Sequence, residues 1–162
     1  MKKPLYLFTC ICMIISMTAP KQTPSVEFDC VAQNLRRAAR LVTRRYEEAL
    51  RPVDLTASQF TILQALDGRR AVPQGMLADI LGFEQTTMTR LAALMLIRAL
   101  ITAQPDPDDK RGRLLSISKD GTKLYGQAAP LWQKAQTLTL GRMPPNEWHG
   151  VRKALKTLSA EV

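Results

Sequence analysis

The chain has 162 residues, of which 46% are hydrophobic and 23% charged, enough for one domain with its own core and unlike a disordered or fibrous protein. Lysine and arginine outnumber aspartate and glutamate by 23 to 14, and the net charge of +9 favours an anionic partner such as nucleic acid or a membrane surface. Residues 55–120 nevertheless carry eight basic and seven acidic side chains, so a functional assignment must rest on residue patterns.

Residues 1–25 read as an apolar tail followed by a linker. Two lysines precede the mostly apolar run Leu5–Met17, which is shorter than the roughly 20 residues that a bilayer-spanning helix needs. Three interpretations stay open. The run is an export signal that ends near Ala19, an extension upstream of a true start at Met13 or Met17, or a tail that packs on a partner subunit. The first would make this an exported basic helical protein without a DNA-binding role.

The three cysteines all lie near the N-terminus, at Cys10, Cys12 and Cys30. An odd count is not typical of a disulfide framework. They are either small apolar residues without a special role or a thiol-based or soft-metal sensing cluster.

Residues 26–52 show the spacing of a long amphipathic helix. Apolar residues recur every three or four positions, arginines and glutamates fill the other face, and Pro52 ends the segment. A helix with one apolar stripe and no adjacent antiparallel partner needs another element or another chain to cover that stripe.

Three shorter helices are expected next. Thr56 caps the first, which carries Phe60 and Leu66 and ends at Gly68. Residues 69–72 read as a loop. The second helix covers Met76–Leu81, and the third runs from Gln85 to Leu100.

The second and third helices have the pattern of a helix-turn-helix. Ala78 is small where the two helices approach each other, and Gly82 permits the sharp turn between them. The polar first turns of the third helix can enter the major groove of DNA and reach base edges and phosphates. The candidate DNA-binding residues here are Gln85, Thr86, Thr87, Thr89 and Arg90.

A β-hairpin is predicted directly after this helix, which makes it a wing. Ile101–Gln104 and Arg113–Ile117 read as strands, joined by a turn-rich, charged connection. Its tip offers Lys110, Arg111 and Arg113, cations that suit the narrow and strongly negative minor groove.

Two more helices complete the chain. Ser118 caps a helix with an apolar stripe and an expected bend near Pro130, and Asn146–Ser159 forms the last. His149 is the only histidine, and we find no Ser/His/Asp set, phosphate loop or paired carboxylates with catalytic spacing. The chain is therefore expected to be no enzyme and to need no cofactor.

The ordered motifs between Leu55 and Gly121 resemble the MarR family of winged-helix transcription regulators. The matching stretches are Leu55-Thr56-x-x-Gln59-Phe60, Leu77-Ala78-x-x-Leu81-Gly82, Thr86-Thr87-x-Thr89-Arg90, Asp109-Lys110-Arg111 and Ser118-x-x-Gly121. The likeness covers about residues 26–160.

The resemblance implies a mainly α fold with a small β-hairpin wing. A winged helix-turn-helix over residues 55–120 would be flanked by dimerisation helices at 26–52 and 119–160, so that residues 26–162 form one MarR-type domain. It implies a cytoplasmic homodimeric repressor on a palindromic double-stranded operator, relieved by a small aromatic or thiol-reactive effector, with no stable membrane partner. By the same resemblance, Asp109 braces the wing and Arg111 enters the minor groove.

Some residues depart from the family pattern. Ala99 stands where glycine is usual, and Leu94, Leu96 and Ile97 replace charged residues in the recognition helix. The reactive cysteine of peroxide-sensing members would fall at Ala32, so that chemistry is not expected here.

Overall fold

A computed structural model describes residues 30–160 of the chain. The apolar run, the linker, Cys10 and Cys12 lie outside the described residues. Of the described residues, 36–160 belong to one compact unit. Within the described range, no helix combines the length and apolar character that crossing a membrane would require.

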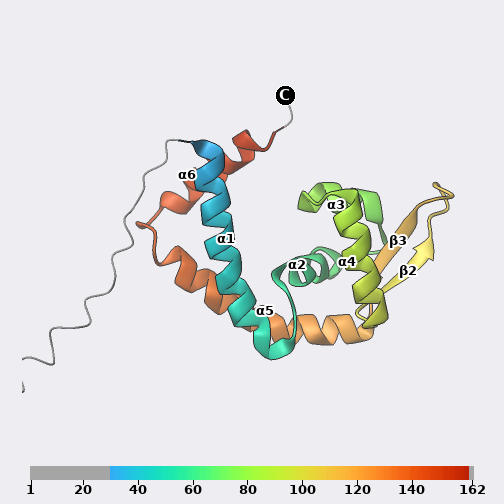
Figure 1. Cartoon of the computed structure of the whole chain (residues 1–162). Helices are drawn as coiled ribbons and strands as arrows, with labels where there is room; N and C mark the ends of the chain where they lie inside the picture. Colours follow the sequence, from blue (N-terminus) through green and yellow to red (C-terminus); the bar gives the residue numbers. More distant parts are fainter. Residues whose placement is uncertain (1–29, 161–162) are drawn as a thin grey trace, which may run out of the picture. The chain divides into compact units, whose positions relative to one another are not determined.

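The described residues confirm a mainly helical fold with a small antiparallel sheet (Figure 1). In chain order the elements are α1 (Val31–Leu50), the 3-10 turn η1 (Arg51–Val53), α2 (Ala57–Leu66), β1 (Val72–Pro73), α3 (Gln74–Leu81), α4 (Gln85–Ile97), β2 (Ile101–Pro105), β3 (Arg113–Ile117), α5 (Lys119–Leu140) and α6 (Glu147–Leu158).

The sheet has one strand more than the sequence indicated. Residues 69–72 were expected to form a loop, but Val72 is buried and begins β1, which pairs antiparallel with β3 through Val72 opposite Leu115. β3 also pairs with β2, from Ile101 opposite Ile117 to Pro105 opposite Arg113, and therefore forms the centre of the sheet. A two-residue strand between loop and helix has no hydrophobic period of its own, so only its partner reveals it.

The recognition helix also ends earlier than expected, at Ile97 rather than Leu100. Ala99 adopts a left-handed backbone with φ of 55°. The Leu100 amide donates to the Met95 carbonyl and the Ala99 amide to the Leu96 carbonyl, both at 2.9 Å. These two bonds form a Schellman motif, the turn that commonly ends a helix and that usually has glycine at the left-handed position.

The core lies where α2 meets the helix-turn-helix and the sheet. Phe60 and Leu63 of α2, Met88 and Met95 of α4, and Leu115 of β3 are each at most 1% exposed. The start of α2 carries a complete capping box, in which the Thr56 hydroxyl accepts from the Gln59 amide while the Gln59 side chain accepts from the Thr56 amide. The capping box fixes the start of α2, and the core contacts pack α2 against α3 and α4.

An aromatic cluster joins α1 and α5 to α2. The rings of Tyr46 and Trp132 stack at 5.9 Å between centroids, and Phe60 lies 5.5 Å from Trp132 and 5.4 Å from Tyr125. Burial raises the pKa of Tyr46, and the neighbouring Thr139 hydroxyl offsets part of that rise. α5 continues through Pro130 without a break, and Figure 1 shows it change direction along its length.

Candidate nucleic-acid interface

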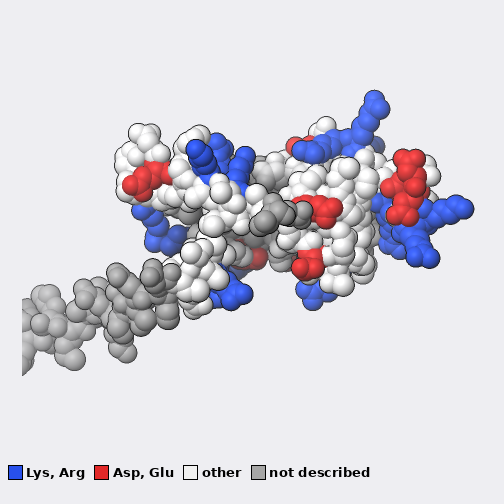
Figure 2. Space-filling view, turned by 90° about the horizontal axis from the view of Figure 1, so that it is seen from above, with Lys and Arg blue, Asp and Glu red and all other residues white. Residues whose placement is uncertain are grey.

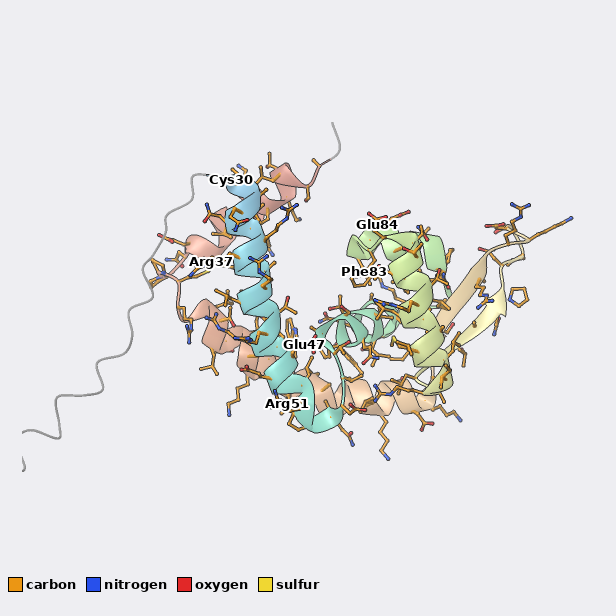
Figure 3. The ribbon with its side chains drawn as sticks, viewed as in Figure 1. Cys30, Arg37, Glu47, Arg51, Phe83 and Glu84 are labelled. Atoms are coloured by element: carbon orange, nitrogen blue, oxygen red, sulfur yellow. The ribbon has the colours of Figure 1, made fainter. Side chains whose placement is uncertain are left out.

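The turn between α3 and α4 sets the direction of the recognition helix. Gly82 has a left-handed backbone with φ of 66°, and the Phe83 amide donates to the Ala78 carbonyl at 2.9 Å. Ala78 itself is fully buried. The chain then reaches Glu84, which precedes the first turn of α4 (Figure 3). Glycine suits this position because the turn requires a conformation that other residues adopt only with strain.

One face of α4 is buried and the other presents polar side chains. Met88, Ala92 and Met95 point into the core at helical spacing. The predicted contact residues Gln85, Thr86, Thr89 and Arg90 are exposed, whereas Thr87 is half-buried. The first turns of α4 are thus anchored by their apolar side and offer amide, hydroxyl and guanidinium groups to a ligand.

Thr89 is held in place by two hydrogen bonds. Its hydroxyl donates to the Gln85 carbonyl at 2.8 Å and accepts from the Gln74 side-chain amide at 3.0 Å. With both bonds formed, the hydroxyl retains one acceptor lone pair and no free proton. Gln74, at the start of α3, was not predicted as a site residue, because only the tertiary fold brings it beside α4.

The wing tip is organised by aspartates. The Asp109 carboxylate accepts from the Arg111 amide at 2.9 Å, and the Gly112 amide donates to the Asp109 carbonyl at 2.8 Å. The Asp106 carboxylate accepts from the Asp108 amide at 3.0 Å. A carboxylate bonded to the amide two residues on is an Asx turn, which fixes the backbone of a short loop. Asp109 therefore fixes the backbone position from which the Arg111 side chain extends.

Gly112 is a second requirement of this turn. A Cβ atom there would lie 3.0 Å from the Asp109 side chain and 3.1 Å from Cβ of Asp106. A side chain at residue 112 would therefore crowd both aspartates and force them to shift by a few tenths of an ångström.

A groove of about 440 Å³ lies between the start of α4 and the wing. Gln85 and Thr89 line it from α4, and Arg111 and Arg113 from the hairpin, together with Gln74 and the two aspartates of the wing. Figure 2 shows lysine and arginine side chains beside a group of acidic ones at the hairpin end of the molecule. One concave surface therefore joins hydrogen-bonding groups of the helix to cations of the wing.

The groove does not include every predicted residue. Thr86, Thr87, Arg90 and Lys110 are not among its lining side chains. Three of these four are exposed next to it in sequence, and Thr87 is half-buried.

The far end of α4 is clamped to α5. The Ser118 hydroxyl donates to the Ala99 carbonyl at 2.6 Å, the Ser118 amide donates to the Leu100 carbonyl at 3.1 Å, and the Gly121 amide donates to the Ser118 hydroxyl at 2.9 Å. Gly121 packs so closely that a Cβ atom would lie 2.0 Å from the Leu100 carbonyl oxygen. This contact explains why serine and glycine stand three residues apart at the end of the wing.

The same end of α4 also contacts the start of α2. The Arg98 guanidinium forms an ion pair of 3.1 Å with Asp54 and a longer bond of 3.4 Å to the Gln59 side chain. Glu47 of α1, labelled in Figure 3, accepts from the Ala57 amide at 3.0 Å. The Asp54 side chain is almost fully exposed, so this ion pair adds little stability, but it joins the end of α4 to the segment between η1 and α2.

A sequence model of the MarR family matches residues 53–112, the segment that contains α2, α3, α4, the first wing strand β2 and the wing tip up to Gly112. The chain is 28% identical over 105 residues to the transcriptional regulator HosA of Escherichia coli O111:H-, a match that covers 65% of this chain and 76% of HosA. The chain belongs to the MarR family. The resemblance predicted from the sequence is therefore confirmed, and with it the expectation of a transcription regulator rather than an enzyme.

Two solved structures of DNA-binding proteins share this fold. The transcriptional regulator MOSR of M. tuberculosis, in complex with DNA, has a TM-score of 0.73 and 29% identity over 80% of this chain and 93% of MOSR. BpsR of Bordetella bronchiseptica, whose DNA binding is regulated by 6-hydroxynicotinic acid, has a TM-score of 0.75 and 25% identity over 83% of this chain and 96% of BpsR. The MarR-family protein described here thus has the winged helix of both.

Proposed function

We propose that this MarR-family regulator binds double-stranded operator DNA through the groove between α4 and the wing. The first turns of α4 lie in the major groove, where Gln85, Thr86, Thr87, Thr89 and Arg90 read base edges and phosphates. Lys110, Arg111 and Arg113 of the wing lie on the adjacent minor groove. The observation that carries the proposal is that Gln85, Thr89, Arg111 and Arg113 line one groove, because a single duplex must contact the helix and the wing together.

A dimer on a palindromic operator is the second part of the proposal. Large apolar side chains on the terminal helices stay uncovered within the described chain, among them Leu138 at 64% exposure and Leu158 at 60%. A second copy covers them and places two recognition helices on successive half-sites, so the operator has twofold symmetry.

Binding of this kind represses transcription, and an effector relieves it. The effector is either a small aromatic compound or a thiol-reactive one. Regulation of BpsR by 6-hydroxynicotinic acid supports a small aromatic effector. The second rests on Cys30, an exposed free thiol in the described part of the chain, together with Cys10 and Cys12. If the thiols sense the signal, diamide lowers DNA affinity in the natural protein and leaves a triple Cys→Ser variant unchanged.

The proposed place of action is the cytoplasm, where the operator is. The rival, an exported basic protein without a DNA-binding role, rests on the run Leu5–Met17. Cell fractionation with N-terminal sequencing separates the two. A processed chain outside the cytoplasm would overturn the regulator proposal.

The decisive experiment measures DNA binding directly. Fluorescence anisotropy with the intergenic DNA upstream of the protein's own gene should give a dissociation constant on the order of 10⁻⁸ M at physiological salt, rising steeply as salt is added. A duplex of the same composition in scrambled order serves as the control and should bind at least about 1,000-fold more weakly. Equal affinity for both duplexes, or no binding up to about 1 μM, would reject the proposed function.

A further inference from the structure

The hydroxyl of Thr89, on the second turn of α4, faces the groove as a hydrogen-bond acceptor only. Its proton is bonded to the Gln85 carbonyl at 2.8 Å, and one of its lone pairs accepts from Nε2 of Gln74 at 3.0 Å. The side chain is exposed and lines the groove between α4 and the wing. A hydroxyl has one proton and two lone pairs, so a single lone pair is left for a ligand.

Gln74, the first residue of α3, keeps the hydroxyl in this orientation. Because Thr89 accepts from Nε2, it cannot turn its own proton toward Gln74, and the proton stays on the Gln85 carbonyl. Gln74 itself is half-buried and lines the same groove. The Gln85 side chain also lies beside the start of α3, since a Cβ atom at Gly75 would be 3.9 Å from its Nε2.

Thr86 on the same helix differs from Thr89 in this respect. It is exposed, and its hydroxyl forms no hydrogen bond within the part of the chain that the structure describes. Its proton is therefore available to a phosphate oxygen and its lone pairs to a base. Two threonines of one helix thus offer different chemistry to DNA, and only the tertiary contact with Gln74 distinguishes them.

A group that only accepts can bond to few positions on a duplex. Phosphate oxygens carry no proton, and N7 and O6 of guanine, N7 of adenine and O4 of thymine are acceptors too. None of these atoms can donate to the remaining lone pair of Thr89. In the major groove the donors are the exocyclic amino groups, N6 of adenine and N4 of cytosine.

We propose that Thr89, held by Gln74, recognises the exocyclic amino group of an adenine or a cytosine in the major groove and makes no hydrogen bond to phosphate. This inference rests on the DNA binding proposed above and names the chemical group that one residue of that interface selects. Thr89 determines the specificity, and Gln74 is a positioning residue because it acts through the Thr89 hydroxyl.

Fluorescence anisotropy of the full chain with base analogues tests the proposal. In a short duplex from the intergenic DNA upstream of the protein's own gene, each adenine is replaced in turn by purine and each cytosine by 2-pyrimidinone, which lack the exocyclic amino group. At the base that Thr89 contacts, the replacement should weaken binding of the natural protein about fivefold, as the loss of one hydrogen bond does. Whether that base is an adenine or a cytosine decides between the two sources of the amino group.

Thr89→Val identifies the residue responsible, because it exchanges the hydroxyl for a methyl group of similar size. This variant should bind the unmodified duplex about fivefold more weakly than the natural protein and should lose nothing more when that one amino group is removed. Weaker base pairing caused by the analogue affects both proteins equally, so the comparison isolates the contact.

Three further variants sharpen the test. Thr86→Val is the matched control and should keep the fivefold sensitivity to the amino group, and Thr89→Ser, which retains a hydroxyl, should keep it as well. Gln74→Met has a similar length but no proton to donate, so the Thr89 hydroxyl is free to turn and the sensitivity should fall to about twofold. A role of Gln74 in folding alone would leave the sensitivity at fivefold. Thermal unfolding confirms that each variant retains the fold.

Three results would overturn the assignment. If the natural protein prefers the operator duplex to a scrambled one, but no amino group is coupled to Thr89, the proposed DNA binding stands and this inference alone fails. If the effect of Thr89→Val is coupled instead to replacement of one phosphate by methylphosphonate, Thr89 is a phosphate contact. Equal affinity of the natural protein for operator and scrambled duplexes would reject the proposed function and this inference with it.

Discussion

The winged-helix portion, residues 55–120, and the terminal helices α1, α5 and α6 differ in how completely each buries its apolar side chains. Nearly all buried hydrophobic residues lie between Leu50 and Leu115. Within the described residues α6 buries no side chain, and α1 buries only Leu50. Trp148 and Leu155 of α6 remain 38% and 39% exposed although they share one stripe.

The winged-helix portion buries its apolar side chains within one chain, whereas the terminal helices do not. The winged-helix portion has a close-packed core and capped helices, so its shape is set within one chain. The terminal helices carry amphipathic stripes that one chain leaves in contact with water, and such stripes mark an association surface. The portion proposed to face DNA and the helices proposed to pair subunits can therefore be disturbed separately.

The largest expected effect comes from breaking the terminal helices. Leu155→Glu puts a charge into the apolar stripe of α6 and should convert the proposed dimer to a monomer in light scattering. Affinity for the full operator should then fall at least about 100-fold, because the two half-sites no longer bind as one unit.

Lys153→Glu, on the opposite side of α6, is the control for this variant. It should retain both the dimer and the tight binding, apart from a small electrostatic loss. A dimer that survives Leu155→Glu with unchanged operator affinity would show that the exposed stripe of α6 is not the association surface.

The contact between the winged-helix portion and α5 is most sensitive at Gly121. Gly121→Ala drives a methyl group into the Leu100 carbonyl, 2.0 Å away, and should lower the free energy of unfolding by about 3 kcal/mol. Gly126→Ala on the same helix meets no atom within 4 Å and should instead raise it by about 0.5–1 kcal/mol. Urea denaturation measures both, and similar values for the two variants would contradict the close packing of α4 against α5.

A smaller effect is expected from removing one wing cation. Arg111→Ala should weaken operator binding about tenfold and lower the slope of log affinity against log salt by about one unit, as the loss of one phosphate contact does. Arg44→Ala, an exposed arginine on α1, is the matched control and should leave the slope unchanged. An Arg111→Ala protein with the natural slope and affinity would remove this residue from the interface.

The smallest effect concerns the two helix ends of the helix-turn-helix. Gly82 and Ala99 both have a left-handed backbone, but only Ala99 carries the strain of a Cβ atom. Ala99→Gly should therefore stabilise the protein by about 1 kcal/mol, and Gly82→Ala should destabilise it by about the same amount. Thermal melts of the pair check this, and a destabilising Ala99→Gly would contradict the left-handed end of α4.

Local signals predicted much of the fold. The caps at Thr56 and Ser118, the turn at Gly82 and the strand Arg113–Ile117 all depend on residues that lie within a few positions of one another. Hydrophobic spacing likewise indicated the helices and their order. The C-terminal end of α4 was predicted three residues too late, because alanine rarely adopts the left-handed backbone that Ala99 has and gives no local signal for a helix end.

What the sequence determined by itself was the set of elements, their order and the residue types at the candidate interface, since caps, turns and periodicity act between near neighbours. Only the tertiary structure decided that Val72 joins the sheet, that Gln74 holds Thr89, and that Arg111 and Gln85 share a groove. These features depend on packing between segments that are distant in the chain, where no local pattern fixes the contact.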